Sequence, residues 1–250
     1  MEVNLDKITR QGKALLLAYD QGMEHGPEDF NDENVDPARI LEIAESGYFT
    51  GIILQKGVAE KYYDPTKNKV PLIVKLNGKT NLVKDEDPYS PQVCSVSEAL
   101  SYGAAAVGYT IYIGSEFESK MVKEFGRIEQ EAEEANIPVI AWMYPRGRNI
   151  PDDKDPKVIA YAARIGLELG ADMVKVNWPG DKESFRWVVE SAGKTKVIAA
   201  GGSKENLEDF LVKTREILNA GGIGLAVGRN VWQAEDPLTV AKQISEVIWP

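Results

Sequence analysis

Met173-Val174-Lys175-Val176-Asn177-Trp178 is a short apolar run with one lysine in its middle. The run follows Gly170-Ala171-Asp172 and ends before Pro179-Gly180, which predicts a buried strand between a helix end and a turn. An ammonium group is costly in a strand buried on both faces, because desolvating a charge costs several kcal/mol. Lys175 must therefore face a polar cavity, pair with a carboxylate, or be partly neutral. A partly neutral amine can attack a carbonyl, whereas a paired lysine would be structural.

Similar apolar runs alternate with amphipathic helical segments along the chain. Eight strand–helix units without a low-complexity linker predict an α/β fold, a single (β/α)8 TIM barrel that takes residues 1–250 as one domain. An open doubly wound sheet is the alternative, but no Gly-x-Gly-x-x-Gly follows the first predicted strand. The predicted strands are Ala14–Tyr19, Gly51–Gln55, Leu72–Leu76, Ala105–Tyr109, Pro138–Trp142, Asp172–Val176, Lys196–Ala200 and Ile223–Val227.

Three of the predicted helices begin with the same dipeptide, at Asp36-Pro37, Asp155-Pro156 and Asp236-Pro237. In each, the aspartate can cap the free N–H groups of the first turn. The proline then fills the first helical position, where no N–H donor is needed. These pairs fix where three helices start.

The charge of the chain limits its partners. It has 29 basic and 39 acidic residues, a net charge of −10, which argues against nucleic acid and against an anionic membrane surface. The first seven residues contain no apolar signal core, and no run reaches about 20 apolar residues, so we expect no membrane span. A single cysteine, Cys94, excludes an intrachain disulfide and favours a reducing cytoplasm.

The chain also has a single histidine, His25. One histidine and one cysteine cannot supply a zinc site of several His or Cys ligands, and a Ser-His-Asp triad would have to use His25. We therefore expect no metal and no cofactor. The chemistry must depend mainly on Lys, Tyr, Asp, Glu or Arg.

A barrel places its active site at the C-terminal ends of its strands. Ala200-Gly201-Gly202-Ser203 and Val227-Gly228-Arg229-Asn230 end the last two predicted strands. Barrels often bind a phosphate there through backbone N–H groups, and Arg229 could add a charge-assisted bond. The alternative is that these glycines serve only tight turns.

Two other strand ends carry groups that could take part in catalysis. In Trp142-Met143-Tyr144-Pro145-Arg146-Gly147, Tyr144 is either a proton donor and acceptor or a packing residue. In Leu17-Ala18-Tyr19-Asp20-Gln21-Gly22-Met23-Glu24-His25, Asp20 could bind a substrate hydroxyl, hold an ammonium group, or cap a turn. His25 could contact a phosphate or cap the loop.

Two lysines compete with Lys175 for the role of nucleophile. Lys75 also lies in an apolar strand and Lys56 follows the second strand, and periodicity does not rank the three. The longest connection, 77–92, carries Lys84-Asp85-Glu86-Asp87-Pro88 and is either a mobile lid or a solvated excursion.

Several motifs together resemble archaeal-type class I fructose-bisphosphate aldolase over nearly the whole chain. They are Leu17-Ala18-Tyr19-Asp20, Lys75-Leu76-Asn77-Gly78-Lys79-Thr80, Val107-Gly108-Tyr109-Thr110-Ile111-Tyr112, Tyr144-Pro145-Arg146-Gly147, Met173-Val174-Lys175 and Val227-Gly228-Arg229-Asn230-Val231-Trp232.

The resemblance implies a metal-independent barrel aldolase that cleaves fructose 1,6-bisphosphate to dihydroxyacetone phosphate and glyceraldehyde 3-phosphate. Lys175 matches the family's Schiff-base lysine, Tyr144 its proton-transferring tyrosine and Asp20 its strand-one aspartate. The loops at Gly202 and Arg229 would hold one phosphate, while Arg146 and His25 would reach the other end. The implied substrate-binding residues are Gln21, His25, Trp142, Arg146, Val176, Asn177, Ala200, Gly201, Gly202, Gly228 and Arg229. The resemblance further implies a cytoplasmic homo-oligomer of pentameric rings, single or paired as a decamer, in glycolysis and gluconeogenesis.

The chain departs from the family pattern at three positions. Gln21 stands where the family commonly has histidine, Asn177 where it often has a second lysine, and Ala200 where it often has serine. The last two changes each remove a phosphate contact, and a charged contact is worth about 1.5–3 kcal/mol. An alternative is therefore a related imine-forming barrel, a transaldolase, thiolase or amino-sugar synthase that acts on another phosphorylated keto compound. A second alternative is a barrel that binds phosphate without catalysing a reaction.

Overall fold

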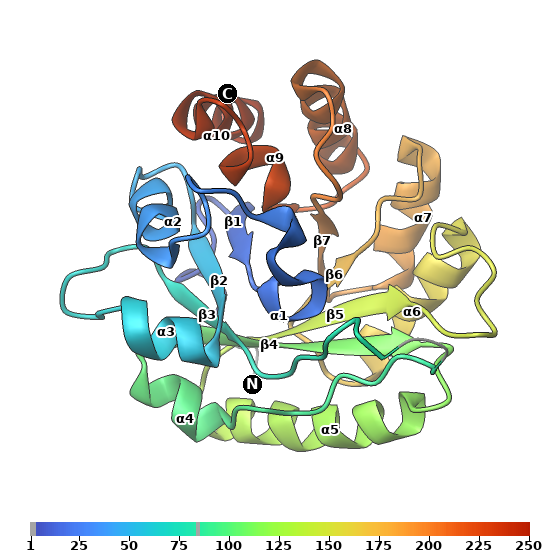
Figure 1. Cartoon of the computed structure of the whole chain (residues 1–250). Coiled ribbons are helices and arrows are strands. Elements are labelled where there is room, and N and C mark those ends of the chain that lie inside the picture. The colour runs from blue at the N-terminus through green and yellow to red at the C-terminus, as the bar shows by residue number, and fades with distance from the viewer. Residues whose placement is uncertain (1–3, 84–85) are drawn as a thin grey trace.

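The computed structural model describes residues 4–83 and 86–250. Its eight strands form one closed parallel barrel in sequence order, from β1 to β8, with β8 paired back to β1 (Figure 1). The predicted barrel is confirmed, and the open sheet is not formed. The strands are β1 (Ala14–Tyr19), β2 (Gly51–Gln55), β3 (Leu72–Lys75), β4 (Ala104–Ile113), β5 (Val139–Pro145), β6 (Met173–Val176), β7 (Lys196–Ala200) and β8 (Gly224–Val227).

Helices surround the barrel, and short helices follow β1, β2 and β8 closely (Figure 1). The three predicted Asp-Pro helix starts are confirmed. Asp36, Asp155 and Asp236 each accept a backbone N–H of the first turn through the side chain. The helices are α1 (Gly22–His25), the 3-10 helix η1 (Gly26–Asp29), α2 (Pro37–Ala44), α3 (Lys56–Tyr62), α4 (Val96–Ser101), α5 (Glu118–Glu134), α6 (Pro156–Glu168), α7 (Lys182–Ser191), α8 (Leu207–Asn219), α9 (Arg229–Trp232) and α10 (Pro237–Ile248).

Strands β4 and β5 continue beyond their predicted ends at Tyr109 and Trp142. Their pairing runs without interruption from Val107 opposite Val139 to Ile113 opposite Pro145. The additional residues of β4 are buried, so the pairing persists where a loop was predicted. As a result, Tyr112 and Tyr144 lie in paired strands and not in flexible loops.

Successive strand residues alternate between two buried layers. The inner layer fills the barrel and contains Leu16, Ile73, Trp142 and Met173, among others. The outer layer lies between the strands and the helices. Because side chains alternate along a strand, Lys75 and Lys175, two residues beyond Ile73 and Met173, also point into the barrel.

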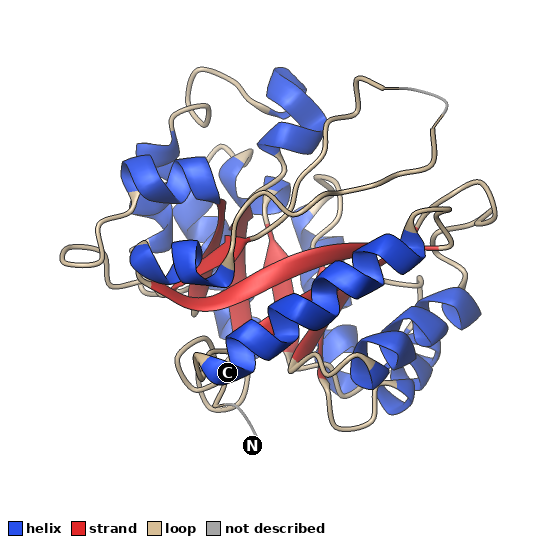
Figure 2. Ribbon diagram, turned by 90° about the horizontal axis from the view of Figure 1, so that it is seen from below, coloured by secondary structure: helices blue, strands red, loops and turns tan. Residues whose placement is uncertain are grey.

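The N-terminal end of the barrel is closed and packed. Ile8 is fully buried in the inner layer, and the Lys13 ammonium donates to the carbonyl oxygen of Ile248 at 2.7 Å. On the outside, the long helix α5 lies along β4 (Figure 2). No helix of the described residues has the length and apolar character needed to cross a bilayer. Because the N-terminal end of the barrel is packed, the opposite end is the one that can hold a site.

Candidate active site

A cavity of about 730 Å³ opens at the C-terminal ends of the strands. It is lined by all three predicted catalytic residues, Asp20, Tyr144 and Lys175. Of the predicted substrate-binding residues, only Val176 does not line it. Val176 follows the inward-facing Lys175, so its side chain points outward and is fully buried in the outer layer. The side chain of Val176 therefore does not face the cavity, and the assignment of Val176 to substrate binding stays a prediction.

Lys175 lies on the inner face of β6 and is 6% exposed. Its Nζ is 5.3 Å from the centre of the Trp142 ring and 5.9 Å from that of Tyr144. Within the described residues Nζ makes no hydrogen bond and no ion pair. Burial lowers the pKa of Lys175, and the carboxylates of Asp20 and Glu24 oppose this only in part. The amine is therefore biased toward its neutral, nucleophilic form.

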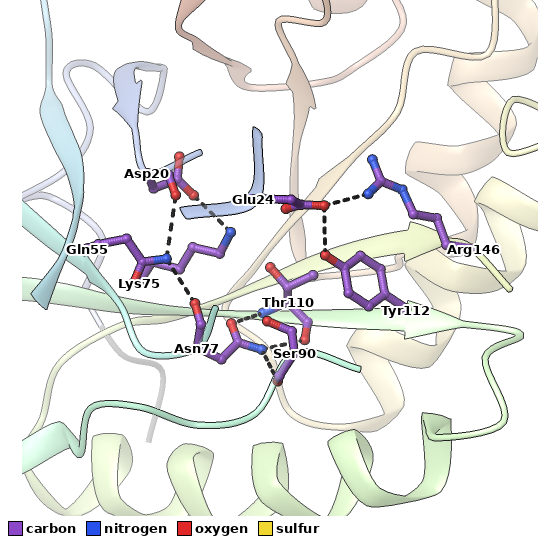
Figure 3. Close-up of polar contacts among 9 residues, drawn as sticks. All are labelled: Asp20, Glu24, Gln55, Lys75, Asn77, Ser90, Thr110, Tyr112 and Arg146. Carbon is purple, nitrogen blue, oxygen red and sulfur yellow. Dashed lines mark hydrogen bonds and ion pairs between the residues drawn. The ribbon is translucent and has the colours of Figure 1, made fainter. Parts of the chain in front are cut away.

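Lys75 lies on β3 and is also buried, but it has a partner. Its Nζ is 3.2 Å from Oδ2 of Asp20, and both side chains are 6% exposed (Figure 3). Burial alone would raise the pKa of Asp20, but Lys75 and Lys175 hold that pKa below its ordinary value. Asp20 thus holds an ammonium group, one of the roles that the sequence allowed, and the ammonium group that it contacts directly is that of Lys75 and not that of Lys175. Lys56, the third candidate, pairs with Glu98 at 2.7 Å and does not line the cavity.

Tyr144 and Trp142 form one wall of the cavity beside Lys175. Burial raises the pKa of Tyr144, with a further contribution from Asp20, so its phenol stays protonated and can donate. The Trp142 indole lies directly over Gly108 of β4, where a Cβ atom would come within 1.6 Å of the ring. Trp142 is 1% exposed, and its indole N–H has no partner among the described residues.

Glu24 is a partly buried site residue that sequence reasoning missed. Its Oε1 accepts from the Arg146 guanidinium at 2.7 Å and from the Tyr112 hydroxyl at 3.0 Å (Figure 3). Burial would raise the pKa of Glu24, but Lys75 and Arg146 hold it below its ordinary value. The available signal was a carboxylate four residues after Asp20, in the segment that leaves β1.

His25 lies next to the loop after β8. Its Nδ1 is 2.6 Å from Oδ2 of Asp29, and Oδ1 of Asp29 is 3.6 Å from the Arg229 guanidinium. One carboxylate thus links the two residues. The prediction that His25 reaches with Arg146 toward the far end of the substrate does not fit this link, since its neighbour Glu24, and not His25, holds Arg146.

The loops after β7 and β8 form one wall of the cavity and present backbone N–H groups that could bind an anion. The N–H groups of Gly202 and Ser203 have no acceptor among the described residues, and Gly202 has φ of +75°, which favours glycine. Asn230 joins the loops, since its amide donates to the carbonyl oxygens of Gly201 and Ser203, both at 3.0 Å. Gly228 is required for close approach, because a Cβ there would lie 2.7 Å from the Ala18 oxygen.

The three positions that depart from the family pattern all line the cavity. The Gln21 amide nitrogen is buried without a partner among the described residues. The Asn177 amide donates to the carbonyl oxygen of Asp153 at 3.2 Å, and Ala200 presents only a methyl group.

The long loop after β3 is held along its second half. The Asp87 carboxylate accepts from the backbone N–H groups of Glu116 and Arg148, both at 2.9 Å, and Ser115 donates to the Pro88 oxygen at 2.7 Å. Asn77 anchors the first turn by bonding to Ser90 and Thr110 (Figure 3). Of the segment predicted as either a lid or a solvated excursion, Lys84 and Asp85 lie outside the described residues. The half from Asp87 onward is fixed to the barrel.

No cluster of three or more His, Cys, Asp or Glu side chains within residues 4–83 and 86–250 is arranged to hold a metal ion. What the cavity offers is a buried amine, a phenol, two paired carboxylates and free backbone N–H groups. This combination suits attack on a carbonyl group of a phosphorylated substrate.

Comparison with known proteins points to the same chemistry. A family model described as DeoC/LacD family aldolase matches residues 14–234. The class 1 fructose-bisphosphate aldolase of Thermoproteus tenax is 50% identical over 245 residues, which cover 97% of this chain and 92% of that protein.

Two solved structures share the fold closely. One is of a Schiff-base-forming fructose-1,6-bisphosphate aldolase, 48% identical, with a TM-score of 0.94 and 98% of each chain covered. The other, with the same identity, coverage and TM-score, is of an archaeal fructose-1,6-bisphosphate aldolase whose catalytic lysine is covalently bound to the carbinolamine intermediate of the substrate.

Proposed function

The chain belongs to the DeoC/LacD family of aldolases, and from this premise we propose that it is a class I fructose-bisphosphate aldolase. It reversibly cleaves fructose 1,6-bisphosphate to dihydroxyacetone phosphate and glyceraldehyde 3-phosphate through an imine. The observation that carries the proposal is Lys175, a buried amine without a counter-ion among the described residues, placed beside a phenol at the barrel mouth.

In this reaction the neutral amine of Lys175 attacks C2 of the open-chain ketose and forms a carbinolamine. Loss of water gives a protonated imine, which accepts the electron pair as the C3–C4 bond breaks. The aldehyde product leaves, and the remaining enamine is protonated at C3 and hydrolysed to dihydroxyacetone phosphate. The imine is the electron sink, so the step needs no metal ion.

Tyr144 moves the protons. As a phenol it donates to the hydroxyl group that leaves the carbinolamine. The phenolate then accepts the C4 hydroxyl proton during bond cleavage, which restores the phenol for protonation of the enamine. Asp20, held by Lys75, is placed to orient the carbinolamine hydroxyl.

The two phosphates hold the reacting carbons in position. The Gly202 and Ser203 N–H groups, with Arg229, bind the phosphate nearer C2, and His25 lies on the same side through Asp29. Arg146 binds the other phosphate from the opposite side of the cavity. Gln21, Trp142 and Asn177 contact the chain of the sugar between them. Binding energy from both ends is then available to the chemical step.

Trapping of the imine tests the proposal. Incubation with dihydroxyacetone phosphate and borohydride should add one reduced substrate per chain, located by peptide mass at Lys175. Lys175→Ala should lose both adduct and cleavage activity, whereas Lys56→Ala, the control at another strand end, should keep both. An adduct on Lys75, or none at all, would overturn the mechanism. An adduct without cleavage of fructose 1,6-bisphosphate would instead favour another phosphorylated keto substrate. Phosphate binding without an adduct would favour a barrel that binds phosphate and has no catalytic activity.

The assembly and setting of the enzyme complete the proposal. We propose that residues 1–250 act as one domain in a cytoplasmic homo-oligomer of pentameric rings that serves glycolysis and gluconeogenesis. Large apolar side chains on adjacent helices support self-association, since Tyr161 of α6 is 64% exposed and Trp187 of α7 is 58% exposed. Light scattering after gel filtration tests the assembly, and a monomer at micromolar concentration would contradict it.

A further inference from the structure

The site contains one buried carboxylate, Asp20, and one partly buried carboxylate, Glu24, and each already has a cation of its own (Figure 3). Asp20 pairs with Lys75 at 3.2 Å, and Glu24 pairs with Arg146 at 2.7 Å. The Asp20 and Lys75 side chains are equally inaccessible, so water screens their attraction poorly. The negative charges nearest the nucleophile are therefore taken up before any substrate arrives.

The Asp20–Lys75 pair is held in place from both sides. Gln55, paired with Lys75 across β2 and β3, donates to the main-chain oxygen of Asp20 at 3.4 Å and to that of Asn77 at 3.0 Å. The bridge ties the end of β1 to the end of β3, the strand that carries Lys75. The pairing is thus part of the scaffold and not a chance contact of a long side chain.

Among the described residues, Lys175 is the buried lysine that has no carboxylate partner in this arrangement. No carboxylate of the described residues lies within 4 Å of its Nζ. The amine lies over the faces of the Trp142 and Tyr144 rings. The carboxylates that act electrostatically on it are those of Asp20, which follows β1, and Glu24 of α1. Other groups that line the same cavity include Lys75, Tyr144, Arg146 and Arg229, and the carboxylates of Asp153, Glu205, Asp209 and Glu216.

We propose that Lys75 is a positioning residue for the nucleophile: by holding the Asp20 carboxylate, it denies Lys175 a counter-ion and keeps Lys175 as a neutral amine. The positive charge of Lys75 acts in the same direction, because a second cation disfavours protonation nearby. Without Lys75, Asp20 would turn to the next buried cation, Lys175, and stabilise the unreactive ammonium form. This inference rests on the proposed imine chemistry.

The test follows the pH dependence of Lys175 labelling by dihydroxyacetone phosphate and cyanoborohydride. Lys75→Met removes the charge at similar volume, and should move the acid limb of the labelling rate upward by about one pH unit or more. Labelling at a fixed pH on that limb would then be about tenfold slower. Lys75→Arg restores the charge and should return the limb toward that of the unmodified protein. Lys56→Met, which breaks an ion pair outside the cavity, should leave it unchanged. An unmoved limb in a folded Lys75→Met variant would overturn the inference.

Lys75→Met leaves a buried carboxylate unpaired and could fail to fold, so a second pair of variants carries the same test. Asp20→Asn leaves Lys75 as an unpaired cation, and Asp20→Asn with Lys75→Met leaves neither charge. The acid limb of the double variant should lie at higher pH than that of Asp20→Asn, by less than the shift expected for Lys75→Met alone, because both variants lack the carboxylate that Lys75 holds. Coincident limbs would overturn the direct effect of the Lys75 charge, and an equal or larger shift would overturn the role of Asp20. Absence of any Lys175 adduct in the unmodified protein would instead refute the proposed function.

Discussion

Gly108→Ala should damage the active site while leaving the barrel folded. A Cβ atom at this position would lie 1.6 Å and 1.8 Å from two carbons of the Trp142 ring, far inside ordinary contact distance. The indole must therefore retreat by about 2 Å, since carbon contacts begin near 3.5 Å. Trp142 is paired with Lys175 across β5 and β6, and its ring centre is 5.3 Å from the amine. The substitution moves a wall of the reaction site.

The size of the effect follows from this displacement. A misplacement of about 1 Å can cost roughly 100-fold in rate, so we expect kcat/KM to fall by at least that factor. Overpacking of this kind costs about 1–3 kcal/mol of the free energy of unfolding, too little to unfold a barrel outright. An assay of fructose 1,6-bisphosphate cleavage measures kcat/KM, and a urea melt followed by circular dichroism measures the free energy of unfolding.

A matched control is available in α5. A Cβ atom added at Gly126 would meet nothing within 4 Å, and this glycine lies in a helix interior. Gly126→Ala should therefore stabilise the protein by roughly 0.5–1 kcal/mol without changing activity. If Gly108→Ala keeps full activity in a protein that melts like the unmodified one, Trp142 is not needed at its observed place. The reasoning would then be refuted.

Four further outcomes are expected. Tyr144→Phe should still form the Lys175 adduct but lose about 10²–10⁴-fold in turnover, and a near-normal rate would make Tyr144 a packing residue. Arg229→Ala and Gly202→Val should each raise the Michaelis constant for fructose 1,6-bisphosphate. Gly202→Val acts by straining the backbone, because Gly202 has a positive φ and no atom within 4 Å of an added Cβ. An unchanged Michaelis constant in both variants would place the phosphate elsewhere. Because burial lowers the pKa of Lys175, the acid limb of its labelling should have a midpoint below 10.5, and a midpoint at 10.5 or above would contradict this. Activity should persist in excess EDTA, and a loss restored by zinc or manganese would refute imine chemistry.

The barrel could be predicted because its signals are local. An apolar run marks each strand, a glycine-containing turn precedes several of them, and Asp36-Pro37 marks a helix start, whatever the rest of the chain does. The ends of β4 and β5 were harder to predict from the sequence, because the length of these strands depends on mutual pairing that continues to Ile113 and Pro145. The inward direction of Lys175 also follows from local alternation, which turns the neighbouring side chain of Val176 outward.

The pairing of charges could not be predicted in the same way. Arg146 and its partner Glu24 are separated by 122 residues, and Asp20 meets Lys75 only because β1 and β3 approach across the barrel mouth. Asn230 shows the same limit, since its role depends on the loop after β7 and not on its own helix. Sequence patterns place each residue at the C-terminal end of the barrel, but they do not say which cation a carboxylate takes.

That choice decides the chemistry. Three lysines stand at strand ends, and two of them, Lys56 and Lys75, have a carboxylate within 3.2 Å. The Lys56–Glu98 pair is partly exposed and lies outside the cavity, whereas the Lys75–Asp20 pair is buried, so its separation would leave a buried charge uncompensated. Lys175 is as buried as Lys75 but lacks such a partner in the described part of the chain, so loss of its proton removes a desolvated charge and breaks no ion pair. The proposed nucleophile thus differs from Lys75 in what its neighbours have already bound, and not in its burial.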